Sequence, residues 1–264
     1  MRIHFFKYQA TGNDFVLINN LSGSYKFSQD QIRSICDRRF GVGADGLMLI
    51  EKHPAVNFNL RYFNSDGSQS LCGNGSRAAV SLAASLGLVN GHAKFEAFDG
   101  IHDAEILEDG NIRLRMNDVR EVKRMNEDYF VNTGSPHFIR FLSDVGNHPV
   151  FDEGRQIRTS DMFSPGGTNV NFVEKTDQNT IFVRTYERGV EDETLSCGTG
   201  VTAAALASSY HGLTSPVTVK TLGGVLQVEF SSRHSDLPAG QADTFHDIYL
   251  IGPAKLVFEG DLEL

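Results

Sequence analysis

The chain has 264 residues, of which 40% are hydrophobic and 22% charged, an ordinary composition for one large globular domain or two smaller ones. Its 24 basic and 33 acidic residues give a net charge of −9 without a basic run, so we expect no nucleic-acid partner. The first seven residues lack the apolar core of a signal peptide, and no apolar segment reaches membrane-spanning length. We therefore expect a cytoplasmic protein with no membrane partner.

Most of the chain is predicted to form short strands. Residues 28–36 open with a capping-box pattern and continue as an amphipathic helix, in which Cys36 is expected to be a small core residue. Residues 56–62 alternate between apolar and polar, as a half-buried strand does. Residues 104–116 predict a hairpin that turns at residues 109–111. Further strands are expected at residues 180–187, 217–221, 225–230, 247–251 and 255–258.

One short motif occurs twice, at positions separated by nearly half the chain. Cys72-Gly73-Asn74-Gly75 and Cys197-Gly198-Thr199-Gly200 each place a cysteine before two glycines. Alanine-rich stretches follow, at residues 78–89 and 201–210, and are apolar or small nearly all round. Such a composition is typical of a helix that is buried on every face.

The repeated motif predicts a reactive thiol at each helix N-terminus, because the macrodipole and the unpaired N–H groups favour a thiolate there. The same N–H groups form an anion-binding turn, so we expect Gly73, Asn74, Gly198 and Thr199 to hold a carboxylate or a phosphate. A phosphate is disfavoured, because neither motif continues into Gly-Lys-Ser/Thr. Neither cysteine has a second Cys or His at ligand spacing, which argues against a metal. Two such thiols indicate a proton-transfer site with one thiol on each side of a small-molecule substrate.

The duplication predicts an α/β (α+β) fold with two pseudo-symmetric domains. Each is expected to be a sheet wrapped around a central helix, with the active site in the cleft between the domains. We expect residues 1–117 to form the domain that carries Cys72 and residues 118–249 the domain that carries Cys197. The last strand, at about residues 250–264, is expected to return to the first domain.

Seven ordered blocks resemble the diaminopimelate epimerases over nearly the whole length. They are TGNDF at 11–15, RFGVGADG at 39–46, FNSDGS at 63–68, CGNG at 72–75, SPH at 135–137, TNVNF at 168–172 and YERGVEDETLSCGTG at 186–200. The resemblance implies two similar domains, each an antiparallel sheet around a central helix. It implies a cofactor-independent isomerase that converts LL-2,6-diaminopimelate to the meso isomer, in lysine and peptidoglycan precursor biosynthesis. It implies that Cys72 and Cys197 exchange the roles of thiolate base and thiol acid.

The resemblance also implies roles for other residues. His137 and Glu187 would assist the thiols, and Arg188 would bind the distal carboxylate of the substrate through its guanidinium. The amides of Asn13, Asn64 and Asn169 would contact the substrate, as would Glu187. The chain departs from many family members at Ser135, where they have asparagine, and from some at Gly46, where they have glutamine.

Other readings of the cysteine pair stay open. A proline racemase or hydroxyproline epimerase also uses two cysteines, but its substrate has no distal amino-acid group. Arg188, with Asn64 and Asn169, would therefore distinguish a diaminopimelate epimerase from these enzymes. The phenazine-related isomerases share the fold but lack the cysteine pair, so the sequence argues against them. A protein that captures a small anion, or a redox sensor that forms a Cys72–Cys197 disulfide, would show no turnover. A homodimer is compatible with the sequence.

Overall fold

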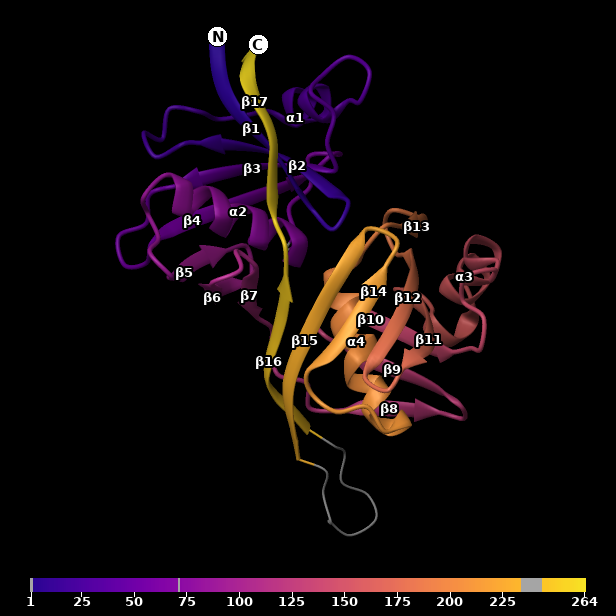
Figure 1. The fold of residues 1–264 in the computed structure, drawn as a ribbon. Helices are drawn as coiled ribbons and strands as arrows, with labels where there is room; N and C mark the ends of the chain where they lie inside the picture. Colours follow the sequence, from indigo (N-terminus) through magenta and orange to yellow (C-terminus); the bar gives the residue numbers. More distant parts are fainter. Residues whose placement is uncertain (1, 71, 234–243) are drawn as a thin grey trace. The chain divides into compact units, whose positions relative to one another are not determined.

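The computed structural model describes residues 2–70, 72–233 and 244–264, and the chain forms two compact units (Figure 1). The first unit contains Met1–Leu114 and Gly252–Leu264, and the second contains Arg115–Ile251. The two ends of the chain lie together in the first unit, because the C-terminal strand β17 pairs antiparallel with β1.

The first unit is one sheet with two helices. Its strand order is β17-β1-β2-β3-β4-β5-β6-β7. The strands are β1 (Arg2–Ala10), β2 (Asn13–Asn19), β3 (Gly46–Glu51), β4 (Phe58–Asn64), β5 (His92–Ala97), β6 (Gly100–Ile106), β7 (Ile112–Arg115) and β17 (Lys255–Glu263). Helix α1 (Gln29–Cys36) joins β2 to β3, and α2 (Gly73–Ser85) joins β4 to β5.

The second unit repeats this plan in the order β8-β9-β10-β11-β12-β14-β15-β16. Its strands are β8 (Val122–Met125), β9 (Asp128–Asn132), β10 (Pro136–Phe141), β11 (Asn169–Asp177), β12 (Thr180–Glu187), β14 (Val217–Thr221), β15 (Gly224–Arg233) and β16 (Thr244–Gly252), and the short β13 (Asp192–Thr194) pairs with β12. Helices α3 (Val150–Arg158) and α4 (Gly198–Ser208) occupy the places of α1 and α2, and 3-10 turns lie at Asp161–Phe163 and Ser209–His211.

The two strand orders match pair by pair, which confirms the predicted pseudo-symmetric fold class. One detail needs correction, because the sheets are mixed rather than antiparallel. In the first unit β2–β3 and β4–β5 are parallel, and in the second β10–β11 and β12–β14 are parallel. A helix crosses over within each of these pairs, and a crossover of this kind returns the chain in the parallel direction.

Several local predictions are confirmed. The hairpin forms between β6 and β7, with Ile106 opposite Ile112, and Ser28 caps α1 in a capping box with Gln31. Helices α2 and α4 begin earlier than predicted, because the glycines of the repeated motif already form their first turns. Helix α3 was not predicted, and its glycine Gly154 lies against the Tyr186 ring, where a larger side chain would clash.

Each repeated helix is enclosed by its own sheet. In α2 every residue from Gly73 to Val80 is buried, and the helix contacts β1, β2, β3 and β4. Helix α4 is buried over Val201–Ser208 and contacts β9, β10, β11, β12, β14 and β15. Alanines at the contact faces permit this close approach. Among the described helices, none combines the length and apolar character needed to cross a membrane.

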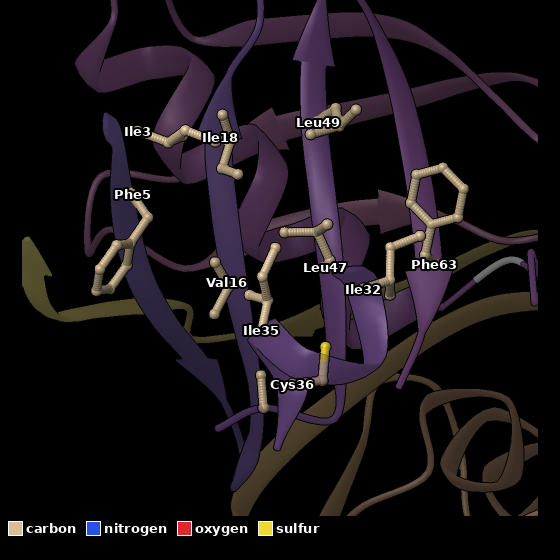
Figure 2. Close-up of a cluster of buried hydrophobic side chains, with 11 residues drawn as sticks. Ile3, Phe5, Val16, Ile18, Ile32, Ile35, Cys36, Leu47, Leu49 and Phe63 are labelled. Carbon is tan, nitrogen blue, oxygen red and sulfur yellow. The ribbon is translucent and has the colours of Figure 1, made fainter. Parts of the chain in front are cut away.

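Helix α1 packs against the strands of the first sheet, as Figure 2 shows. Ile32, Ile35 and Cys36 pack there with Val16 and Leu47 of the strands below. Burial raises the pKa of the Cys36 thiol to about 12, so this cysteine is an inert core residue, as the sequence predicts.

An ionic network built on the buried Lys7 fixes the loop before β3. The Lys7 side chain is 8% exposed and lies 2.6 Å from an Asp14 oxygen, and Arg38 contacts both Asp14 and Asp45 at 2.7 Å. Burial acts to raise the pKa of Asp14, but the hydrogen bonds and charges of Arg38 and Lys7 outweigh it and hold the pKa at about 2. The carboxylate therefore stabilises the fold when it is ionised.

We expect the Asp14→Asn variant to lose about 2 kcal/mol of unfolding free energy at pH 7. Because the folded pKa lies below the ordinary value of 3.8, this contribution is complete above pH 4 and is lost as the pH falls toward 2. Urea unfolding at pH 7 and pH 3 measures the difference between wild type and variant. Asp30→Asn is the control, since the Asp30 side chain is 92% exposed and such surface pairs contribute little. Equal losses in the two variants would contradict the role of Asp14.

Candidate functional site

Each copy of the repeated motif places its cysteine at the N-cap of a buried helix. Cys72 and Cys197 have the same extended backbone, with φ −131° and ψ 112° for the first and φ −114° and ψ 111° for the second. The Cys72 sulfur accepts a hydrogen bond from the Gly75 N–H at 3.4 Å. Both side chains are thiols rather than disulfides, and Cys197 is the more deeply buried. Each unit thus presents one thiol beside the N–H groups of a helix start.

In the first unit Asn13 lies next to Cys72. Its Oδ1 accepts from the Cys72 sulfur at 3.5 Å and from Asn74 Nδ2 at 3.4 Å, while its Nδ2 donates to the Asp45 carboxylate. Asn13 starts β2 directly after a tight turn, in which Gly12 has a φ of 87°. The predicted residues Asn13, Gly73 and Asn74 therefore gather round Cys72, and the ionic network orients the Asn13 amide through Asp45.

Arg77 is a fully buried cation one turn into α2. Its guanidinium donates to Asn74 Oδ1 at 3.0 Å, to Thr11 Oγ1 at 3.4 Å and to the Gly73 carbonyl at 3.5 Å. No ion pair found within residues 2–70, 72–233 and 244–264 includes it. Burial lowers its pKa to about 10, and Cys72 acts in the opposite direction. The sequence reasoning missed Arg77, although a lone charge in an alanine-rich helix was a signal.

In the second unit His137 takes the place beside the helix. It is completely buried at the start of β10, and its Nε2 lies 2.9 Å from Thr199 Oγ1, which in turn lies 3.5 Å from the Cys197 sulfur. Its Nδ1 lies 3.1 Å from Asn171 Nδ2. Burial and the charge of Arg188 lower the pKa of His137 to about 3, so the ring is neutral. Asn171 was also missed by the sequence reasoning.

Asn169 and Arg188 meet at the ends of β11 and β12. Asn169 is 3% exposed; its Nδ2 donates to Ser135 Oγ at 2.8 Å and to the Pro136 carbonyl at 2.9 Å, and its Oδ1 accepts from the Arg188 backbone N–H at 2.8 Å. The amide therefore holds the loop of Ser135 and the main chain of Arg188. The Arg188 guanidinium donates to the Gly166 carbonyl at 3.3 Å, and it takes part in no ion pair within the described ranges.

Asn64 and Glu187 end the equivalent strands β4 and β12. Asn64 hydrogen bonds to Ser68 Oγ at 2.9 Å and accepts from Ser70 Oγ at 3.2 Å, and Glu187 pairs with Asp192 in the β12–β13 ladder. Gly46 stands opposite Asn64, and a Cβ there would meet the Tyr62 ring and the Phe63 carbonyl. Packing against Tyr62 therefore requires glycine at this position.

The polar groups cluster without forming a metal-binding set. Within the part of the chain that the structure describes, no group of three or more His, Cys, Asp or Glu side chains is placed to hold a metal ion. What the geometry offers is a thiol, a helix N-terminus and fixed amide or hydroxyl partners, once in each unit.

Known proteins match both halves of the chain. The family model described as diaminopimelate epimerase matches residues 5–122 and 129–245. A relative named diaminopimelate epimerase from Flavobacterium psychrophilum is 45% identical over 258 residues, which cover 96% of this chain and 98% of the relative. One of the same name from Chlorobaculum tepidum is 39% identical, with 97% and 99% covered.

Solved structures with low sequence identity share the fold. A PhzF-family phenazine biosynthesis protein from Bacillus anthracis superposes over the full length of both chains, with a TM-score of 0.73 and 15% identity. A hydroxyproline epimerase from Agrobacterium vitis has a TM-score of 0.68 and 13% identity, with 100% of this chain and 93% of that chain covered. With the family model matched in both halves and close relatives matched along nearly their whole length, the chain belongs to the diaminopimelate epimerase family, a family of isomerases.

Proposed function

We propose that this protein is an epimerase that interconverts LL- and meso-2,6-diaminopimelate, with Cys72 and Cys197 as its acid–base pair and the two units as its epimerase domains. The observation that carries the proposal is the duplicated half-site. The two units share one strand order, and in each a cysteine thiol lies at the N-cap of a buried helix. An epimerase needs one such group for each face of the reacting carbon, and membership of the family supports this substrate.

The reaction needs only proton transfers. One cysteine, as a thiolate, takes the Cα proton and becomes a thiol, which leaves the bonding electrons on the carbon. The other cysteine, as a thiol, gives a proton to the opposite face and becomes a thiolate, so protons and charge balance. An amino-acid Cα–H is a very weak acid, and the N–H groups of Gly73, Asn74, Gly198 and Thr199 would stabilise the carbanion through the α-carboxylate.

Selection of the substrate is assigned to Arg188. Its backbone is fixed by Asn169, and its guanidinium is held only by the Gly166 carbonyl among the contacts of the described residues. A guanidinium with unused N–H groups binds a carboxylate in a two-pronged geometry. Diaminopimelate has a second carboxylate for it, whereas proline and hydroxyproline do not.

The two-thiol role predicts that Cys72→Ala and Cys197→Ala each abolish formation of the meso isomer, because each face of the carbon needs its own group. Freshly reduced protein without added cofactor is incubated with LL-diaminopimelate in deuterated water. Proton NMR follows the Cα–H signal, and chiral chromatography follows the product. Cys36→Ala is the control, because Cys36 lies in the buried cluster between α1 and the sheet, and this variant should keep its epimerase activity. Turnover by either active-site variant, or none by reduced wild type, would refute the proposal.

Arg188→Ala should lower kcat/KM for diaminopimelate by about 100-fold or more, because a buried carboxylate would lose its charged partner. Steady-state rates at several substrate concentrations measure this. Arg61→Ala is the matched control, since Arg61 pairs with Glu51 on the surface and its side chain is 43% exposed. An unchanged rate for Arg188→Ala, or a wild type that prefers proline, would assign the chain to a substrate without a distal carboxylate.

We further propose that two copies of the chain associate through β17. Leu256, Val257 and Phe258 on this strand are 49%, 56% and 47% exposed, an unusual amount of apolar surface on a strand. A second copy of the same strand would cover it. Sedimentation should show a dimer for the wild type and a monomer for Val257→Asp, while a monomeric wild type would contradict the proposal.

A further inference from the structure

We propose that Asn171 is a positioning residue for Cys197: it fixes the tautomer of His137, and thereby makes the Thr199 hydroxyl a hydrogen-bond donor to the Cys197 sulfur. The inference deepens the proposed function, on which it rests, by adding a residue and a direction of hydrogen bonding that neither the motifs nor the fold supply. Two buried side chains, His137 in β10 and Asn171 in β11, carry it together with the partly exposed Thr199 at the start of α4.

The orientation of the Asn171 amide is fixed by two partners, one a hydrogen-bond acceptor and the other a donor. Its Nδ2 donates to the Phe138 carbonyl at 3.0 Å, and a carbonyl can only accept. Its Oδ1 accepts from the Thr185 hydroxyl at 3.0 Å. Asn171 is completely buried, so no exchange with bulk water relaxes this arrangement. The second hydrogen of Nδ2 therefore points at His137 Nδ1, 3.1 Å away.

A donor that faces Nδ1 makes this nitrogen an acceptor. The neutral imidazole then carries its proton on Nε2, and burial keeps the ring neutral by lowering its pKa to about 3. The Nε2–H donates to Thr199 Oγ1 at 2.9 Å. Since the hydroxyl oxygen already accepts from His137, its own hydrogen can point to the Cys197 sulfur at 3.5 Å.

A hydroxyl that donates to sulfur stabilises the thiolate more than the thiol. The other titratable groups at this end of the sheet include Glu187 and Arg188 at the end of β12, and Glu191 and Asp192 where the chain turns into β13. Helix α4 has no acidic residue in its first turn. Farther along β10 and β12, Arg140 and Arg184 form ion pairs with Glu153 and Glu193. The Asn171–His137–Thr199 relay thus supplies a directed dipole to Cys197 without adding a net charge.

The described residues of the first unit form no such relay, although its backbone is equivalent. In the matching parallel pair Phe15 stands opposite Gly46, as His137 stands opposite Asn169. The second glycine of the first motif, Gly75, faces Met48, whereas Gly200 faces Asn171 and His137. Phe15 and Met48 stand there at the positions of His137 and Asn171, and Asn74 at that of Thr199, so the relay acts on one thiol of the two.

The test measures the ionisation of each thiol in the absence of substrate. Reduced protein is alkylated with iodoacetamide across the pH range, and mass spectrometry quantifies the Cys197 and Cys72 peptides separately. The alkylation midpoint is the pH at which a thiol reacts at half its maximal rate. Thr199→Val should raise the midpoint of Cys197 by about one pH unit. Thr199→Ser keeps the hydroxyl and should therefore keep the wild-type midpoint. The Cys72 midpoint is the internal control and should not move. An unchanged Cys197 midpoint in Thr199→Val would overturn the proposal.

The tautomer is tested separately by nitrogen-15 NMR of histidine-labelled protein. Wild type should show the proton of His137 on Nε2. Asn171→Asp presents an acceptor to Nδ1, so it should move the proton to Nδ1 and raise the Cys197 midpoint as Thr199→Val does. A wild-type His137 protonated on Nδ1 would overturn the proposal even where the Asn171→Asp variant fails to fold. These readouts need no turnover, so a protein inactive on diaminopimelate would refute the proposed function and leave the relay to be decided by the two measurements.

Discussion

A helix that is buried on all its faces can offer only its end to a ligand, and the structure depends on this constraint twice. Helix α2 over Gly73–Val80 and most of helix α4 are buried within their sheets, so mainly small residues line them, with the buried Arg77 as an exception in α2. The unpaired N–H groups of their first turns still need partners. In α2 the Cys72 sulfur accepts from one of them, the Gly75 N–H, and under the proposed function a substrate carboxylate would accept from others.

The enclosure also explains why most polar side chains beside each thiol are hydrogen bonded, although Ser76 Oγ and Arg77 Nε in α2 have no hydrogen-bond partner among the described residues. An unsatisfied polar group next to a buried helix end is costly, and the side chains there form short chains with fixed direction. In the first unit the chain runs from the Arg77 cation through Asn74 and Asn13 to the Asp45 carboxylate. In the second it runs from Asn171 to Cys197. Duplicated backbones thus support two different electrostatic environments.

Sequence patterns predicted much of this molecule, and the physical reason differs from feature to feature. Strands such as β12 and β14 alternate in burial and end at turn residues, so the local sequence pattern predicts where they begin and end. The parallel pairs were not predicted, because alternation alone does not encode strand direction. Helix α3 was missed, because it has only two buried residues, Val150 and Gly154, and its apolar pattern is correspondingly weak.

The site divides in the same way. The repeated Cys-Gly-x-Gly motif and the family blocks determined by themselves which thiols to single out and which reaction to test, since a motif needs only neighbours in sequence. Only the tertiary structure decided that Arg77 is a buried cation without a carboxylate partner in the described part of the chain, that Asn169 holds Arg188, and that Asn171 orients His137. These contacts join residues on different strands and helices, and their direction depends on which atom of an amide faces a donor, information that no local spacing contains.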